Sequence, residues 1–169
     1  MKNENQKSKP YRHRQSMRLK GYDYAQPGMY FVTICVQNKL CLFGDIINGQ
    51  IKCNDAGNML WFCFYQIENQ FAGIKCDECI VMPNHIHFII TVTEARQQCH
   101  SIDHIVGWWK TMTTTNYIRG VKRYGWQRFD KKLWQRSYWD SIIRNEVMLY
   151  EIREYIKYNP QKWSTDSLK

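Results

Sequence analysis

Two histidines, His85 and His87, stand two residues apart in the segment HIHFIITV. The β-branched and aromatic residues of that segment predict a strand over residues 85–92. Alternate side chains of a strand leave the same face, so both imidazoles lie on one side with their α-carbons about 7 Å apart. The other side is apolar and is expected to pack on helices: Ile86, Phe88, Ile90 and Val92. We therefore expect the histidines on the exposed face of a sheet, where both can bind one metal ion.

A first candidate for completing such a site is the pair Cys76 and Cys79 in the sequence CDEC. With the two histidines these thiols would form a closed tetrahedral zinc site. Against it, Cys79 alternates with Val81 in a strand predicted over residues 78–82, which suggests a buried thiol. A Cys/His structural zinc site remains one way to complete a metal site around the histidines, and a second set of residues offers another.

A second candidate lies in the segment EIREYIKYNP. Glu151, Tyr155 and Asn159 are each four residues apart, so they share one face of a helix predicted over residues 146–158. If that helix packs beside the histidines, Asn159 can offer an amide oxygen to the same metal ion while Tyr155 points at it. The structural alternative is a Tyr155 that packs in the core and an Asn159 that ends the helix before Pro160.

Hydrophobic periodicity predicts the elements that must position these residues. Strands are expected over residues 29–36, 78–82, 85–92 and 138–144, and helices over residues 54–71, 101–119 and 146–158. The order β, α, β, β, α, β, α indicates an α+β fold with a ferredoxin-like (split βαβ) antiparallel sheet, helices on one face and an added C-terminal helix. Residues 1–20 are predicted to be a basic N-terminal arm, and residues 21–169 a single domain.

The 169 residues carry 24 Lys and Arg against 15 Asp and Glu, which gives a formal net charge of +9. The excess lies towards the two ends, over residues 1–24 and 119–169. Such a molecule is attracted to polyanions, and nucleic acid is the first candidate partner. The second region interleaves cations with Tyr and Trp, a mixture that pairs phosphates with charges and bases with aromatic rings. The expected DNA-binding residues are Arg12, Arg14, Arg18, Lys20, Lys122, Arg123, Arg128, Lys131, Lys132 and Arg136.

The cysteine and hydropathy patterns favour a location inside the cell and away from membranes. Seven cysteines, an odd number, are scattered through predicted strands and helices, which argues against a secreted disulfide framework. No apolar run approaches the roughly 18 residues of a membrane span, and residues 1–15 are not followed by the apolar core of a signal peptide. We expect a cytoplasmic protein without membrane contact.

Three segments, PNHIHFI, LWQRSYWDSIIRN and EYIKYNP, occur in that order and follow the leader RLKGYDYAQPGMYFVTI. Together they resemble the HUH single-strand endonucleases of the IS200 type, and most closely the REP-associated tyrosine transposases. The resemblance covers residues 16–163. It implies the same ferredoxin-like fold and makes residues 21–169 a single HUH (Y1) transposase-like catalytic domain.

The resemblance also implies a role for each matching residue. His85 and His87 would be metal ligands, Tyr155 the nucleophile, and Asn159 the third protein ligand, where insertion-sequence relatives usually carry Gln. The cation would be Mg²⁺ or Mn²⁺ rather than zinc in a closed site, because a phosphate oxygen must enter its coordination shell. Glu151 or a bound water would accept the proton of the tyrosine.

The implied function is that of a metal-dependent endonuclease and strand transferase. It would cut single-stranded or hairpin DNA of palindromic, REP-like repeats through a 5′-phosphotyrosine intermediate. The alternative is a non-catalytic ferredoxin-like module that binds single-stranded nucleic acid on its sheet. Ser141 departs from the family, whose members commonly have a histidine there. Insertion-sequence relatives exchange the tyrosine helix between subunits whereas REP-associated relatives look monomeric, so we expect a monomer, with a dimer as the alternative.

Deleting residues 1–24 should weaken the binding of hairpin DNA, because seven of the 24 basic residues of the chain lie there. The plot of log K against log salt has a negative slope, and each lost phosphate contact reduces its steepness by about 0.9. The deletion should therefore make the slope shallower by several units. Titration of a labelled hairpin over a range of salt concentrations measures it. An unchanged slope would show that these residues do not contact DNA.

Overall fold

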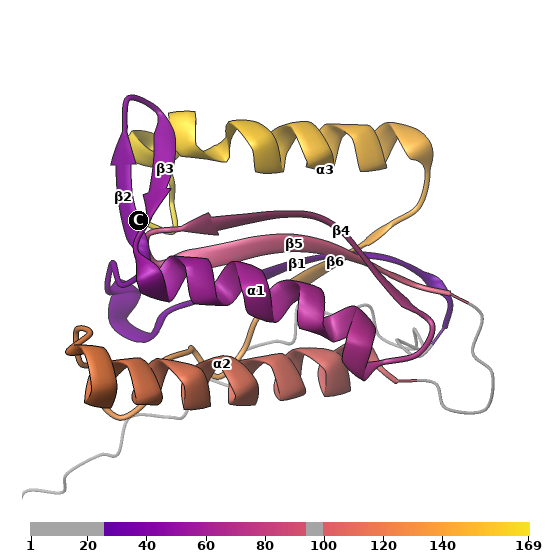
Figure 1. The fold of residues 1–169 in the computed structure, drawn as a ribbon. Helices are drawn as coiled ribbons and strands as arrows, with labels where there is room; N and C mark the ends of the chain where they lie inside the picture. The colour runs from indigo at the N-terminus through magenta and orange to yellow at the C-terminus, as the bar shows by residue number, and fades with distance from the viewer. Residues whose placement is uncertain (1–25, 94–99) are drawn as a thin grey trace, which may run out of the picture.

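A four-stranded antiparallel sheet forms the centre of the computed structural model, which describes residues 26–93 and 100–169 (Figure 1). The strands are β1 (Gly28–Cys35), β4 (Ile74–Met82), β5 (His85–Val92) and β6 (Trp139–Ile143), and the α-helices are α1 (Asp55–Gln70), α2 (Ile102–Tyr124) and α3 (Glu146–Tyr158). The strand order is β4-β5-β1-β6. The connections that contain α1 and α2 each pass over one intervening strand, which confirms the predicted ferredoxin-like fold.

Different helices cover the two faces of this sheet (Figure 1). Below one face, α1 and α2 bury the larger core, which includes Ile86 and Phe88 of β5. Above the other face lies α3, where Ile156 packs in a smaller apolar cluster with Ile89 of β5. Successive strand residues alternate between the faces, so His85 and His87 lie on the α3 face together with Ile89.

Polar side chains start α1, α2 and α3. Asn54, Ser101 and Asn145 are the N-caps, and each accepts a hydrogen bond from a backbone N–H of the first turn. Asn54 and Ser101 are also the first residues of the ranges predicted for α1 and α2. α2 runs past its predicted end as far as Tyr124, and Gly125, with φ of 71°, then turns the chain away.

The segments between the predicted elements contain further structure. β2 (Gly44–Ile47) and β3 (Gln50–Cys53) form a hairpin on Asn48 and Gly49, both with positive φ. A short 3₁₀ helix, η1 (Gln37–Lys39), follows β1, and a second, η2 (Asn159–Thr165), follows α3. The α-helix ends at Tyr158, before Pro160, as predicted, and the chain continues as a 3₁₀ helix.

The longest helix of the described residues, α2, has 23 residues and carries charged side chains. No helix within residues 26–93 and 100–169 is both long and apolar enough to cross a lipid bilayer.

Replacing the buried Ile156 with Ala should lower the free energy of unfolding by about 2–4 kcal/mol, because it removes apolar contacts that hold α3 on the sheet. The matched control is Val147→Ala on the exposed side of α3, which should change it by no more than about 0.5 kcal/mol. Urea unfolding measures both. Equal effects of the two substitutions would contradict this packing.

Candidate active site

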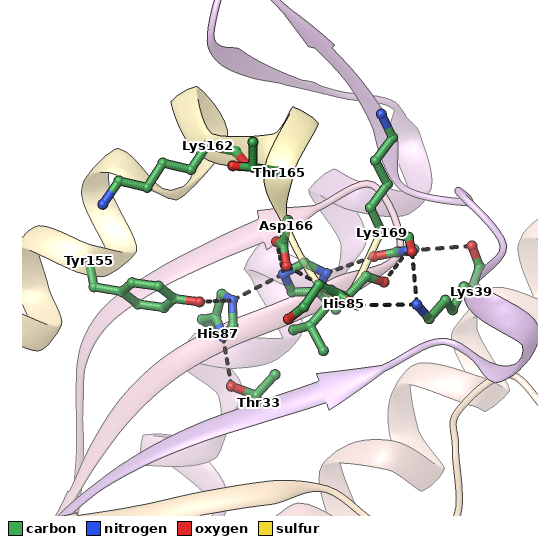
Figure 2. A network of polar contacts seen from close by, with 12 residues as sticks. Thr33, Lys39, His85, His87, Tyr155, Lys162, Thr165, Asp166 and Lys169 are labelled. Carbon is green, nitrogen blue, oxygen red and sulfur yellow. Dashed lines mark hydrogen bonds and ion pairs between the residues drawn. The ribbon is translucent and has the colours of Figure 1, made fainter.

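The Nε2 atoms of His85 and His87 face each other at 3.0 Å (Figure 2). Two ligands of one metal ion that are bonded at about 2.1 Å and meet at a right angle lie about 3.0 Å apart. The pair therefore has the spacing of a shared metal site. Both residues are buried, at 0% and 1% exposure, so the expectation that they lie on an exposed sheet face was wrong. The face is covered by α3 and by the chain around η2.

Asn84, in the turn between β4 and β5, sets the orientation of the His85 ring. Its amide nitrogen donates to the backbone carbonyls of Leu168 at 2.9 Å and Lys39 at 3.4 Å, so its oxygen faces Nδ1 of His85 at 2.7 Å. Because that oxygen can only accept, Nδ1 carries the proton and Nε2 keeps its lone pair. His85 is thus arranged to bind a metal ion through Nε2.

The ring of His87 is held by two residues of β1. The Thr33 hydroxyl lies 2.7 Å from Nδ1 and can donate to it or accept from it, so it suits either tautomer. Phe31 stacks on the imidazole with 5.4 Å between ring centroids. In the sheet register Thr33 stands opposite both His87 and Trp139, so these three side chains form a row across the α3 face.

Tyr155 reaches the histidines from α3. Its hydroxyl lies 3.4 Å from Nε2 of His87, and its ring packs edge-on against Phe31. The residue is 39% exposed, so the alternative of a tyrosine packed in the core was wrong. Tyr155 and His87 belong to the same chain, so the two residues meet without any exchange of helices between subunits.

The surroundings of Tyr155 oppose its ionisation. Burial raises the pKa of the hydroxyl above its usual value near 10, and the carboxylate of Asp166 raises it further. The side chain of Asn159 acts in the opposite direction and lowers this pKa. A phenol in this position needs a positive charge nearby to become a good nucleophile.

Asn159 follows α3 directly, one turn after Tyr155, and is buried. Its Oδ1 atom accepts no hydrogen bond. A buried carbonyl oxygen without a partner is unfavourable, and a bound cation would satisfy it. Asn159 and the paired Nε2 atoms therefore fit the ligand set predicted for Mg²⁺ or Mn²⁺.

Besides Asn84, Thr33 and Phe31, which hold the histidine rings, sequence reasoning missed a carboxylate beside the site. Asp166 follows η2, and its Oδ2 atom lies 3.7 Å from Nε2 of His85. This aspartate lies in a short segment without helical or strand periodicity, so only its residue type could have marked it.

The alternative zinc site is wrong. Cys79 stands opposite Phe88 in the pairing of β4 with β5 and packs in the core below the sheet, on the face away from the histidines. The Cys76 thiol donates to the carbonyl of Phe64 in α1. Burial raises the pKa of Cys76 to about 12 and that of Cys79 well above its usual value, so neither is a ready thiolate ligand. In the described parts of the chain, no three His, Cys, Asp or Glu side chains are close enough together to bind one metal ion without moving.

Two other predicted positions lie near the site. Glu151 shares the helix face of Tyr155 but is exposed, and no hydrogen bond joins the two in the described residues, so its role as proton acceptor stays a prediction. Ser141 stands opposite Phe31 on β6 and is exposed on the α3 face.

The basic region of residues 119–139 returns to the sheet at its histidine end. Trp134 forms a bridge with Val36, one residue after Cys35, which stands opposite His85. All six predicted DNA-binding residues of this region are exposed: Lys122, Arg123, Arg128, Lys131, Lys132 and Arg136. The other four, Arg12, Arg14, Arg18 and Lys20, lie with the predicted arm outside the described residues. DNA binding by all ten stays a prediction.

Comparison with known proteins matches the chain to a family and to several similar proteins. The model of the family described as "Transposase IS200 like" matches residues 50–159, which include both histidines, Tyr155 and Asn159. A Haemophilus influenzae protein described as uncharacterized is 39% identical over 167 residues, covering 92% of this chain and 93% of its own. Another protein of that organism, provisionally named REP-associated tyrosine transposase, is 24% identical over 143 residues, covering 83% of this chain and 74% of its own. The solved structure of a REP-associated tyrosine transposase bound to a REP hairpin has a TM-score of 0.61 and 20% identity, covering 87% of this chain and 74% of that one, and it supports the fold.

The metal-free protein should become less stable between pH 7 and pH 5. Burial lowers the pKa of His85 to about 4 from the 6.5 of an unfolded chain, so on acidification the unfolded state takes up a proton that the folded state does not. The loss from this residue is on the order of 2 kcal/mol at pH 5, and burial of His87 acts in the same direction.

Urea unfolding with a chelator at pH 7, 6 and 5 measures this loss. His85→Gln should reduce the dependence of the free energy of unfolding on pH. The control His104→Gln, at an exposed position, should leave that dependence unchanged. A wild-type protein equally stable at pH 7 and pH 5 would show that the histidines are not buried as neutral rings.

Proposed function

The chain belongs to the IS200-like transposase family, and on that premise we propose that it cuts and rejoins single-stranded or hairpin DNA with Tyr155 as the nucleophile. The observation that carries the proposal is the position of the Tyr155 hydroxyl, 3.4 Å from Nε2 of His87, on a side chain that is partly exposed to solvent. A DNA phosphate that lies against the histidines would be within reach of this oxygen.

The proposed reaction exchanges one phosphate ester bond for another. The phenolic oxygen of Tyr155 attacks phosphorus, the bond between phosphorus and O3′ breaks, and the products are a 5′-phosphotyrosine and a free 3′-OH. The phenol loses one proton and O3′ gains one. Because one phosphate ester bond replaces another, the step needs no external energy source. Attack of a 3′-OH on the phosphotyrosine reverses the chemistry and joins strands.

We propose Mg²⁺ or Mn²⁺ as the cofactor, with His85, His87 and Asn159 as ligands. When bound, the cation would polarise the scissile phosphate and stabilise the charge that develops on it. The 3.0 Å separation of the Nε2 atoms and the partnerless Oδ1 of Asn159 support this ligand set. Asn84 and Thr33 hold the two rings in the orientation that binding needs.

Single-stranded or hairpin DNA fits the surface around the site. Trp139 is partly exposed and stands in one row with Thr33 and His87, where its indole can stack on an unpaired base. The solved relative is bound to a REP hairpin, and by analogy we propose palindromic repeats as the target. We propose a monomer as the active unit, because Tyr155 and His87 meet within one chain.

Tyr155→Phe should keep hairpin binding and abolish both cleavage and the covalent adduct, because only the attacking oxygen is lost. The matched control is Tyr150→Phe, an exposed tyrosine on the same helix, which should cleave at the wild-type rate. Labelled hairpin DNA with Mn²⁺, resolved on denaturing gels, measures both products.

An adduct that survives in Tyr155→Phe would place the nucleophile elsewhere. Binding without cleavage by the wild-type protein would favour a non-catalytic nucleic-acid-binding module instead.

A further inference from the structure

The carboxylate of Asp166 is anchored at one oxygen and aimed at the histidines with the other (Figure 2). Its Oδ1 atom accepts a hydrogen bond from the backbone N–H of Leu168 at 2.8 Å. Its Oδ2 atom is buried, has no hydrogen-bond partner and lies 3.7 Å from Nε2 of His85. The side chain as a whole is 8% exposed. Such a burial of a partnerless carboxylate oxygen is unfavourable without a compensating positive group.

The chain around Asp166 is tied to the histidine end of the sheet. Asn84, which orients His85, donates to the carbonyl of Leu168 at 2.9 Å. Lys39 of η1 donates to the carbonyls of Ser167 and Lys169 at 3.2 and 2.9 Å. These contacts come from two separate segments, so the position of Asp166 is set by the fold rather than by a single side chain.

The atom that Asp166 faces is an acceptor, not a donor. Asn84 fixes the proton of His85 on Nδ1, so Nε2 presents a lone pair to the carboxylate. Two buried acceptors that face each other favour a cation between them. The Oδ1 atom of Asn159, one helical turn after Tyr155, is a second buried oxygen without a hydrogen-bond partner.

We propose that Asp166 is a fourth protein ligand of the cation, beside His85, His87 and Asn159. This inference rests on the proposed function and adds a residue that the family match, which ends at residue 159, does not contain. Two neutral imidazoles and an amide carry no negative charge, whereas Mg²⁺ and Mn²⁺ are usually bound through at least one carboxylate. Four protein ligands leave two of six positions for water and a phosphate oxygen.

Binding would require a small movement of the side chain. Neighbouring ligands of one ion lie about 3.0 Å apart, so Oδ2 of Asp166 would approach His85 by about 0.7 Å from its present 3.7 Å. As they stand, no three His, Cys, Asp or Glu side chains among residues 26–93 and 100–169 are placed to hold a metal ion, so the proposal requires this movement.

Titration of the full chain with Mn²⁺, followed by the electron paramagnetic resonance signal of free Mn²⁺, tests the proposal without DNA or catalysis. Asp166→Asn and Asp166→Ala should each weaken binding by about 10–100-fold or more. The first keeps an acceptor for Leu168 N–H and the second removes it, so a loss common to both reports on the missing carboxylate. The matched control is Asp45→Asn at an exposed position on β2, and His85→Ala is the reference for a lost ligand.

Weaker binding in both Asp166 variants, with wild-type affinity in Asp45→Asn, would support the fourth ligand. Wild-type affinity in either Asp166 variant would overturn this inference and leave the site of two histidines and Asn159 standing. A wild-type protein that binds no Mn²⁺ would overturn the proposed cofactor, and the fourth ligand with it.

Discussion

The close approach of two imidazole nitrogens in a buried position is the constraint that the rest of the site depends on. Nε2 of His85 and Nε2 of His87 lie 3.0 Å apart, and such a pair of lone pairs is unfavourable unless a proton or a metal ion lies between them. The fold holds the arrangement in place through Asn84 on one ring and Thr33 on the other. A buried pair of imidazoles that must share either a proton or a metal ion is the physical reason to regard the pair as functional.

The layer above the sheet turns this pair into a site. α3 packs its apolar side on β5 and β6, and the bidentate pair of Arg153 with Asp77 ties the same helix to β4. Tyr155 then lies at the boundary between the packed layer and solvent, with its hydroxyl towards His87. A nucleophile needs this compromise, because it must be positioned by packing and still be open to a substrate.

The pattern of each single element could be predicted from the sequence. Strand alternation put His85 and His87 on one face, and helical spacing put Tyr155 and Asn159 one turn apart. The burial of the histidines could not be predicted, because periodicity does not say which element covers a sheet face. Asp166 was missed since a carboxylate in an irregular segment has no pattern, whereas the hairpin of β2 and β3 had a readable signal in its Asn-Gly turn.

The most direct test of the nucleophile is to locate the DNA adduct by mass spectrometry after reaction with hairpin DNA and Mn²⁺. Trypsin separates the three tyrosines of α3 into residues 145–153, 154–157 and 158–162, which contain Tyr150, Tyr155 and Tyr158 respectively. Our account predicts a nucleotide phosphate on the peptide of residues 154–157 alone. A nucleotide on any other peptide would contradict it.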